Sequence, residues 1–231
     1  MSFKSKYLIL VICVITFSLN SISGQDKNLR QDMELKDTIS ENVKLWNSLV
    51  FFDHRGTNAI DIGVGGSKTT GDLPDSEFSS YYKFGYKYFI KDHFNVNISY
   101  HNYDVVFGDA YNERFMSFDL NAEYLASPYT QFSPFVQAGF GYNIENQSNN
   151  TSLKFQWSLG VEYILIEGLG LKLFGEHNTN FTDKLDGLRE GTTNDLGFRL
   201  GFGINFYFGG KNRKAERLSR IKTVIKSNLL K

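Results

Sequence analysis

Between Asn58 and Phe208 the sequence keeps a single periodicity, in which apolar residues recur at every second position. The stretch NDLGFRLGFGINFYF, Asn194 to Phe208, shows it most clearly, because each even-numbered position from Leu196 onward is leucine, isoleucine or phenylalanine. A period of two is typical of a β-strand with one apolar and one polar face. The pattern therefore predicts an all-β fold for this region.

Eight runs with this pattern can be separated, because clusters of glycine, aspartate, asparagine, serine and proline interrupt them. The runs cover approximately residues 58–68, 77–90, 94–106, 115–126, 133–144, 153–165, 169–178 and 194–208. The links at 91–93, 127–132 and 166–168 are short, and those at 69–76, 107–114, 145–152 and 179–193 are longer. Short turns at one end and longer loops at the other, with an even number of strands, indicate an outer-membrane barrel. We predict an eight-stranded antiparallel transmembrane β-barrel over residues 57–208.

The apolar face of these strands is sorted along its length, with rings toward the ends and aliphatic side chains in the middle. In the sixth run it reads Phe155, Trp157, Leu159, Val161, Tyr163, and in the fourth Phe118, Leu120, Ala122, Tyr124. Aromatic side chains favour the headgroup interfaces of a bilayer, and aliphatic side chains favour its hydrocarbon. This face is therefore predicted to contact lipid, with a water-soluble antiparallel barrel as the alternative.

The opposite face carries balanced charges, five acidic and five basic side chains. They are Asp61, Lys83, Lys87, Asp119, Glu123, Lys154, Glu162, Lys172, Glu176 and Arg199. An eight-stranded barrel is just wide enough for side chains to fill it, so we predict that these residues form an ion-pair network that plugs the lumen. The alternative is a narrow ion path or a proton relay.

The last run has aromatic residues at Phe202, Phe206 and Phe208, and it resembles the closing strand of bacterial outer-membrane barrels. The similarity, over residues 58–208, is to the small eight-stranded class of the OmpA membrane domain and OmpX-like proteins. It implies outer-membrane lipid and the barrel-insertion machinery as partners. In that class the closing aromatic residue ends the chain, whereas residues 209–231 follow it here.

A second resemblance bears on function. The segments SFDLNAEYL (Ser117 to Leu125) and FSPFVQAGFGY (Phe132 to Tyr142) are similar to barrel regions of proteins filed with curli assembly and transport components. This implies a component of a curli-like or other secretion system as an alternative. The main prediction is a non-enzymatic outer-membrane barrel with a structural, adhesive or assembly-accessory role.

A lipid-modifying enzyme is a third alternative. The segment from His177 to Asn180 resembles the His-x-Ser-Asn segment of lipid A deacylases, in which histidine is the base and serine the nucleophile. Thr179 replaces that serine, and no acidic partner occupies a matching position. The longer loops are acidic, so a bound divalent cation is an alternative to a solvated rim. We expect no catalytic residue, cofactor, metal site or nucleic-acid partner, since no zinc, phosphate-loop or dinucleotide pattern is present.

The first 24 residues are predicted to be a secretory signal peptide. Two lysines precede an apolar run from Tyr7 to Phe17, which is too short to span a bilayer and is followed by small and polar residues. The only cysteine, Cys13, lies in this run, so a mature chain starting at Gln25 has no thiol chemistry. An even number of strands places both ends of the exported chain in the periplasm.

Both flanks of the barrel are predicted to be helical and periplasmic. In residues 25–56, apolar residues recur at helical spacing: Leu35, Ile39, Val43, Trp46 and Val50. In the tail, residues 209–231, eight bases stand against Glu216 alone, and Ala215, Leu218, Ile221, Ile225 and Leu229 form an apolar stripe. We expect the tail to bind an acidic periplasmic partner, or to rest on the inner leaflet with the N-terminal helix, whose Asp32, Glu34, Asp37 and Glu41 offer complementary charge. A solvated extension is the alternative.

Overall fold

The computed structural model describes residues 27–70, 77–108, 111–146, 151–181 and 196–220. The predicted signal peptide, most of the acidic loop residues and the end of the basic tail lie outside this part of the chain. By its internal contacts the chain divides into two units, residues 1–41 and 42–231. Helix α2 (Lys27–His54) begins in the first unit and ends in the second, which contains everything described below.

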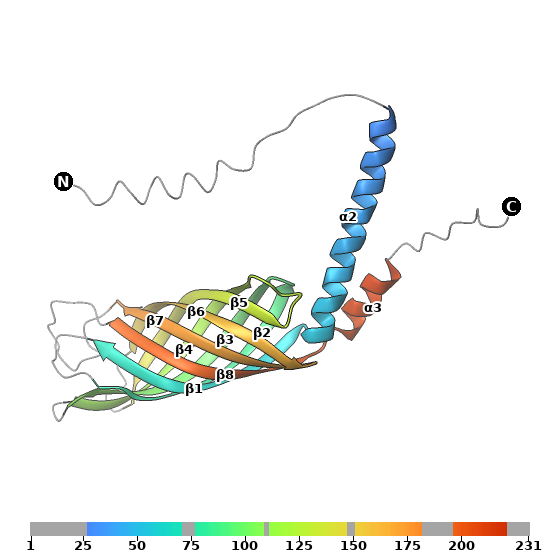
Figure 1. The fold of residues 1–231 in the computed structure, drawn as a ribbon. Helices are drawn as coiled ribbons and strands as arrows, with labels where there is room; N and C mark the ends of the chain where they lie inside the picture. Colours follow the sequence, from blue (N-terminus) through green and yellow to red (C-terminus); the bar gives the residue numbers. More distant parts are fainter. Residues whose placement is uncertain (1–26, 71–76, 109–110, 147–150, 182–195, 221–231) are drawn as a thin grey trace, which may run out of the picture. The chain divides into compact units, whose positions relative to one another are not determined.

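The second unit is a closed barrel in which each strand pairs antiparallel with the next and β8 pairs with β1 (Figure 1). Its strands are β1 (Asn58–Thr70), β2 (Ser79–Lys91), β3 (Phe94–Phe107), β4 (Tyr111–Leu125), β5 (Phe132–Glu145), β6 (Thr151–Ile166), β7 (Leu169–Asn180) and β8 (Leu196–Phe208). The predicted number, order and pairing of the strands are confirmed. The short helix α3 (Lys211–Ser219) follows β8 almost at once.

The hairpin of β3 and β4 is longer than the sequence predicted. A loop was expected over residues 107–114, but the ladder continues until Phe107 pairs with Tyr111. The reason is that the strand continues where apolar alternation stops: Arg114 donates to Asp104 across the two strands at 2.8 Å. The apolar period marks only the part of a strand with an apolar face, so it ends the prediction too early.

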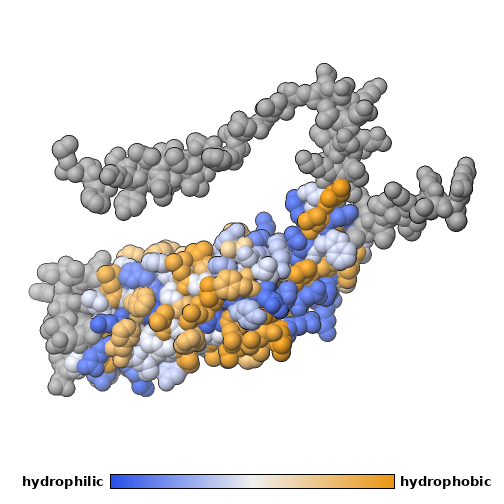
Figure 2. All heavy atoms as spheres, viewed as in Figure 1, coloured by the Kyte–Doolittle hydropathy of each residue, from blue (hydrophilic) through white to orange (hydrophobic). Residues whose placement is uncertain are grey.

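Apolar side chains gather on much of the outer face of the barrel (Figure 2). The charged and amide side chains of the strands are buried inside, together with a cluster of rings. In β8, for example, exposed and buried residues alternate along the whole strand. Phe202 is 69% exposed, and the mid-strand residues Leu120 and Leu159 are 58% and 54% exposed. In a soluble protein such side chains are buried in the core, whereas here they lie on the outer surface of the barrel.

One glycine shows how closely the strands approach where the barrel closes. A Cβ atom added at Gly65 of β1 would lie 2.0 Å from the carbonyl oxygen of Leu200 and 2.6 Å from the Cα of Gly201, both in β8. The backbone cannot yield to that extent without breaking the ladder. Glycine at this position therefore permits the closing pair of strands to meet.

Two helices lie at the barrel end that carries the short turns. The last turn of α2 places Leu49, Phe51 and Phe52 in buried positions, with the Phe51 ring edge-on to Phe89 at a centroid distance of 5.4 Å. Between β8 and α3 the chain turns through Gly209 and Gly210, whose φ angles of 78° and 91° favour glycine. Within the described residues, neither helix combines the length and the apolar character needed to cross a membrane.

Candidate functional site

The barrel interior contains all ten charged residues that the polar face of the strands predicted. None of them is more than 4% exposed, and each lies within 4.0 Å of an oppositely charged partner. They form three groups along the barrel.

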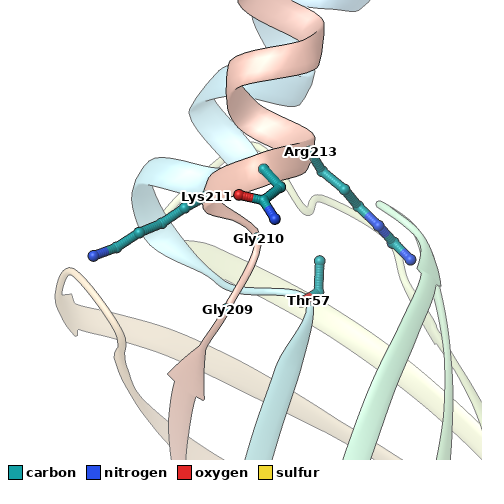
Figure 3. Close-up of a pocket in the computed structure, with 6 residues that line it drawn as sticks. Thr57, Gly209, Gly210, Lys211 and Arg213 are labelled. Atoms are coloured by element: carbon teal, nitrogen blue, oxygen red, sulfur yellow. The ribbon is translucent and has the colours of Figure 1, made fainter.

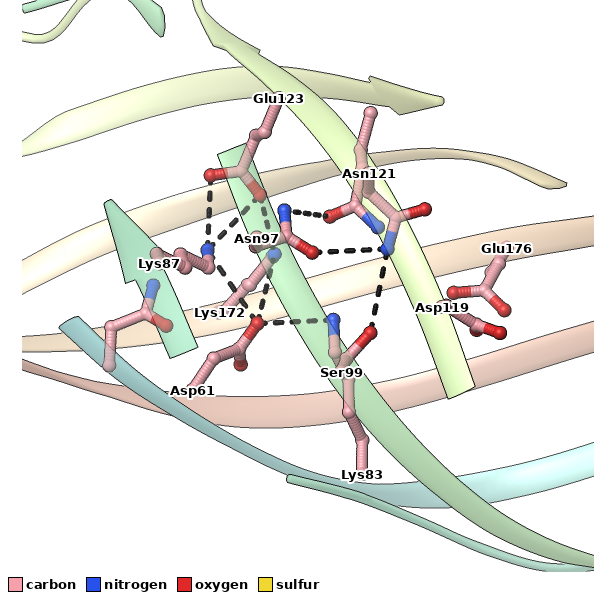
Figure 4. A network of polar contacts seen from close by, with 12 residues as sticks. Asp61, Lys83, Lys87, Asn97, Ser99, Asp119, Asn121, Glu123, Lys172 and Glu176 are labelled. Carbon is pink, nitrogen blue, oxygen red and sulfur yellow. Dashed lines mark hydrogen bonds and ion pairs between the residues drawn. The ribbon is translucent and has the colours of Figure 1, made fainter. Parts of the chain in front are cut away.

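The middle group joins three lysines to two carboxylates (Figure 4). The Asp61 carboxylate receives Lys83 at 3.1 Å, Lys87 at 3.6 Å and Lys172 at 3.7 Å. Glu123 accepts from Lys87 at 3.0 Å and from Lys172 at 2.9 Å, so the two carboxylates share two lysines. The Lys172 ammonium also lies 4.0 Å from the centre of the Phe135 ring, where the aromatic face provides further stabilisation.

The group nearer the long loops is made of two pairs. Lys154 donates to Asp119 at 3.0 Å, and Arg199 donates to Glu176 at 2.7 Å. The Arg199 guanidinium stacks 4.1 Å from the centre of the Tyr103 ring. Buried charges are tolerated when they are paired, and each charge of this group has an oppositely charged partner.

A histidine completes this group. His101 is fully buried, with Nδ1 2.8 Å from the Tyr81 hydroxyl and Nε2 3.0 Å from the Asp119 carboxylate. Its neighbours hold the imidazole on both nitrogen atoms, so it acts as a bridge inside the network.

The group at the terminal end of the barrel is centred on Glu162 and contains a residue that the sequence analysis missed. Arg55, directly after α2, is 2% exposed; its Nε donates to Glu162 at 2.9 Å and its Nη1 donates to the Pro128 carbonyl at 2.7 Å. Tyr207 donates to the same carboxylate from β8, and Asn205 donates to it at 2.5 Å. Burial alone lowers the pKa of the Arg55 guanidinium, but the Glu162 carboxylate outweighs this and raises the pKa above its ordinary value.

Arg55 and the end of α2 therefore close the mouth of the barrel at the short turns. Arg55 ties α2 to β6 through Glu162, and to the β4–β5 turn through the carbonyls of Pro128 and Thr130. Phe51 and Phe52 lie beside it in the buried cluster. No sequence signal identified this residue, because it lies outside the strands and the ten interior charges already balance without it.

The basic tail makes its described contacts with its own barrel. Arg213 donates to the Phe89 carbonyl at 3.1 Å, Lys214 pairs with Asp53, and Arg217 donates to Asp92 at 3.2 Å. A rim pocket of about 380 Å³ lies between the start of β1 and the start of α3, lined by Thr57 and by residues 209–213 (Figure 3). Ile221, Ile225 and Leu229 lie outside the described residues, as do the side chains of Asp32, Glu34 and Asp37.

In the segment considered for acyl hydrolysis, residues 177–180, His177 and Thr179 face the outside of the barrel, whereas Asn178 and Asn180 are buried. His177 alternates with the buried residues Glu176 and Asn178, and it packs edge-on against the Trp157 ring at a centroid distance of 5.7 Å. Its cross-strand neighbours are Trp157 and Phe198. The described contacts of His177 thus include rings and no carboxylate, which is a poor setting for a general base.

The closing-strand aromatics Phe202, Phe206 and Phe208 all point outward, with 69%, 45% and 47% of their surface exposed. They lie on the strand that seals the barrel against β1. Because α3 starts at Lys211, they are followed directly by a folded segment.

The barrel is similar in fold to several solved structures. The Neisserial surface protein A, NspA, is similar with a TM-score of 0.56 and 16% sequence identity, over 66% of this chain and 98% of NspA. The fold is that of the small eight-stranded outer-membrane barrels.

Two further barrels are similar to a lesser degree. The N-terminal β-barrel domain of Pseudomonas aeruginosa OprF has a TM-score of 0.40 and 19% identity, over 66% of this chain and all of that domain. The outer membrane enzyme PagL has a TM-score of 0.39 and 14% identity, over 65% of this chain and 99% of PagL. Neither likeness is close enough to indicate a function.

No protein-family model matches the chain, and no curated protein matches its sequence. The resemblance to curli assembly and transport components gains no support from the structural neighbours.

Proposed function

We propose that this chain is a non-enzymatic outer-membrane barrel with a sealed interior, which acts as a structural, adhesive or assembly-accessory element and not as a pore. The observation that carries the proposal is the interior itself. Ten buried charges, His101 and Arg55 occupy the lumen in paired contacts, and the end of α2 covers one mouth. A pore of this strand number has no width left for a channel once side chains fill it.

The outer wall supports a membrane location. Exposed phenylalanine, tyrosine, tryptophan, leucine, isoleucine and valine side chains occur on it over all eight strands. Such a surface is stable only in an apolar solvent, and closure of the sheet leaves no unpaired strand edge in that solvent. The partners that follow are outer-membrane lipid and the machinery that inserts barrels.

The orientation we propose follows from chain topology. Both helices lie at the end with the short turns, which in small barrels is the periplasmic end. Residues 1–24 are then a cleaved signal peptide, residues 25–56 and 209–231 are periplasmic, and the longer loops face outward. Arg55 therefore closes the periplasmic mouth, and the basic tail is available to an acidic periplasmic partner.

The proposal predicts that the barrel shows no channel activity in conductance measurements. The purified full chain, reconstituted in a planar bilayer, is expected to give no stable single-channel steps, because charge pairs and rings fill the lumen. A large porin in the same bilayer is the control, since its wide lumen conducts. Reproducible unitary openings from the wild-type chain would contradict a sealed interior and favour the ion-path alternative.

A further inference from the structure

The rim pocket between the start of β1 and the start of α3 is flanked by basic side chains without an acidic partner. Three of the five bases in residues 211–220 form ion pairs: Lys214 with Asp53, Arg217 with Asp92 and Arg220 with Glu216. Among the described residues, the other two bases, Lys211 and Arg213, form no ion pair, and both line the pocket (Figure 3). The positive charge that α3 leaves unbalanced is therefore gathered around a cavity of about 380 Å³.

Arg213 is held in place beside this pocket. Its Nη1 donates to the Phe89 carbonyl at 3.1 Å, its Nη2 donates to the Tyr88 hydroxyl at 2.6 Å, and the guanidinium lies 5.6 Å from the centre of the Tyr88 ring. These contacts occupy two N–H groups, and a guanidinium has more than two. A guanidinium that is fixed in position and has no acid beside it is suited to a ligand with negative oxygen atoms, such as a phosphate.

The second base can approach the same pocket from another direction. Lys211 is exposed, and its side chain leaves the start of α3 in a different direction from that of Arg213 (Figure 3). Its long, flexible stem allows the ammonium group to move toward a bound anion. Gly209 keeps space beside the Thr57 hydroxyl, because a Cβ atom there would lie 2.8 Å from the hydroxyl oxygen. The pocket thus combines two cations with a polar floor.

The outer wall fixes the level of this pocket relative to the bilayer. Two of its lining residues, Thr57 and Gly209, are the chain neighbours of Asn58 and Phe208, which pair at the end of the β1–β8 ladder. The exposed Phe208 ring lies 6.5 Å from the exposed ring of Tyr86, centre to centre. Aromatic side chains at the ends of membrane strands lie at the headgroup interface. One residue along a strand is about 3.3 Å, so the pocket lies at that interface as well.

We propose that this rim pocket binds the phosphate of an anionic phospholipid headgroup, with Arg213 as the fixed contact and Lys211 as the flexible one. The inference rests on the membrane location that we propose for the barrel. Basic pockets at a membrane surface recognise acidic headgroups. A phospholipid is favoured over a free anion because its acyl chains can lie along the apolar wall, which begins at Phe208 and Tyr86 next to the pocket.

Native mass spectrometry of the purified full chain in detergent tests this site. The chain is titrated with phosphatidylglycerol, or with phosphatidylcholine of the same acyl chains, whose headgroup has no net charge. We expect the wild-type chain to bind phosphatidylglycerol more tightly, and Lys211→Gln with Arg213→Gln to weaken that binding about tenfold or more. Lys211→Gln alone, which removes no described contact, is expected to weaken it in the same direction. The heat-dependent gel shift of the barrel verifies folding of each variant.

The matched control is Lys44→Gln with Lys91→Gln, which removes the same charge from exposed positions outside the pocket and is expected to leave the affinity nearly unchanged. Three outcomes overturn the proposal. They are equal binding of the two lipids by the folded wild-type chain, an equal loss in the control variant, and displacement of phosphatidylglycerol by inorganic phosphate but not by chloride at equal ionic strength. The last would assign the pocket to a free anion.

Cell fractionation separates a failure of this inference from a failure of the proposed function. If the chain stays in the washed outer membrane but shows one of these three outcomes, only the headgroup site is contradicted. If the folded chain is recovered in the soluble periplasm, the membrane barrel itself is contradicted.

Discussion

Replacing Arg55 with methionine is expected to lower the free energy of unfolding by about 3–5 kcal/mol. The substitution leaves the Glu162 carboxylate, 1% exposed, without its cation and leaves the Pro128 carbonyl without its donor. Removing one partner of a buried pair costs more than the pair contributes, because the other charge stays in a poorly solvated place. Denaturant titration of the barrel in lipid or detergent, followed by tryptophan fluorescence, measures the effect.

Two control variants separate the buried charge from general damage at the barrel end. Arg55→Met combined with Glu162→Leu is expected to regain most of the loss, since no unpaired charge remains. Lys214→Met breaks the nearby pair with Asp53, whose side chains are 36% and 54% exposed, and is expected to cost about 1 kcal/mol or less. A loss for Arg55→Met no larger than that for Lys214→Met would show that Arg55 does not seal the barrel.

Leu120→Arg is expected to destabilise the barrel by about 2–4 kcal/mol in a bilayer. Leu120 points outward between Phe118 and Tyr124, with 58% of its surface exposed, at the level predicted for the middle of the hydrocarbon. Asn112→Arg is the matched control, because Asn112 is exposed on the same strand near the long loops. At that position the guanidinium reaches water, so we expect the barrel to be destabilised by only about 0–1 kcal/mol. Equal costs for the two variants, measured by denaturant titration in vesicles, would contradict the assignment of this face to lipid.

Much of the barrel could be predicted from the sequence because its two solvents differ so strongly. A strand between lipid and a polar lumen must alternate along its whole length, as Leu196 to Phe208 does. Charged residues on the polar face, such as Lys154 and Arg199, must then lie in the interior of the barrel, and this holds for any pairing of the strands. The ten interior residues were found by this argument alone.

The contacts that close the barrel could not be predicted in the same way. Arg55 has no periodic neighbours, and its partners Pro128 and Glu162 are far away in the sequence. The sequence also did not predict which base pairs with which acid, because this depends on the strand register. Lys172, for example, lies across from Glu162 in the β6–β7 ladder, but it forms ion pairs with Glu123 and Asp61. The contacts that Arg213, Lys214 and Arg217 make with the rim were not predicted either, because their partners Phe89, Asp53 and Asp92 lie far away in the sequence.

The central claim is that this chain is a membrane barrel, and cell fractionation tests it most directly. Envelopes of cells that express the full chain are separated into soluble periplasm, inner membrane and outer membrane, and the membranes are washed with urea to remove adhering proteins. The exposed apolar wall predicts that the chain stays in the washed outer membrane and migrates differently in gels with and without heating. Recovery of the folded chain in the soluble periplasm would contradict the account.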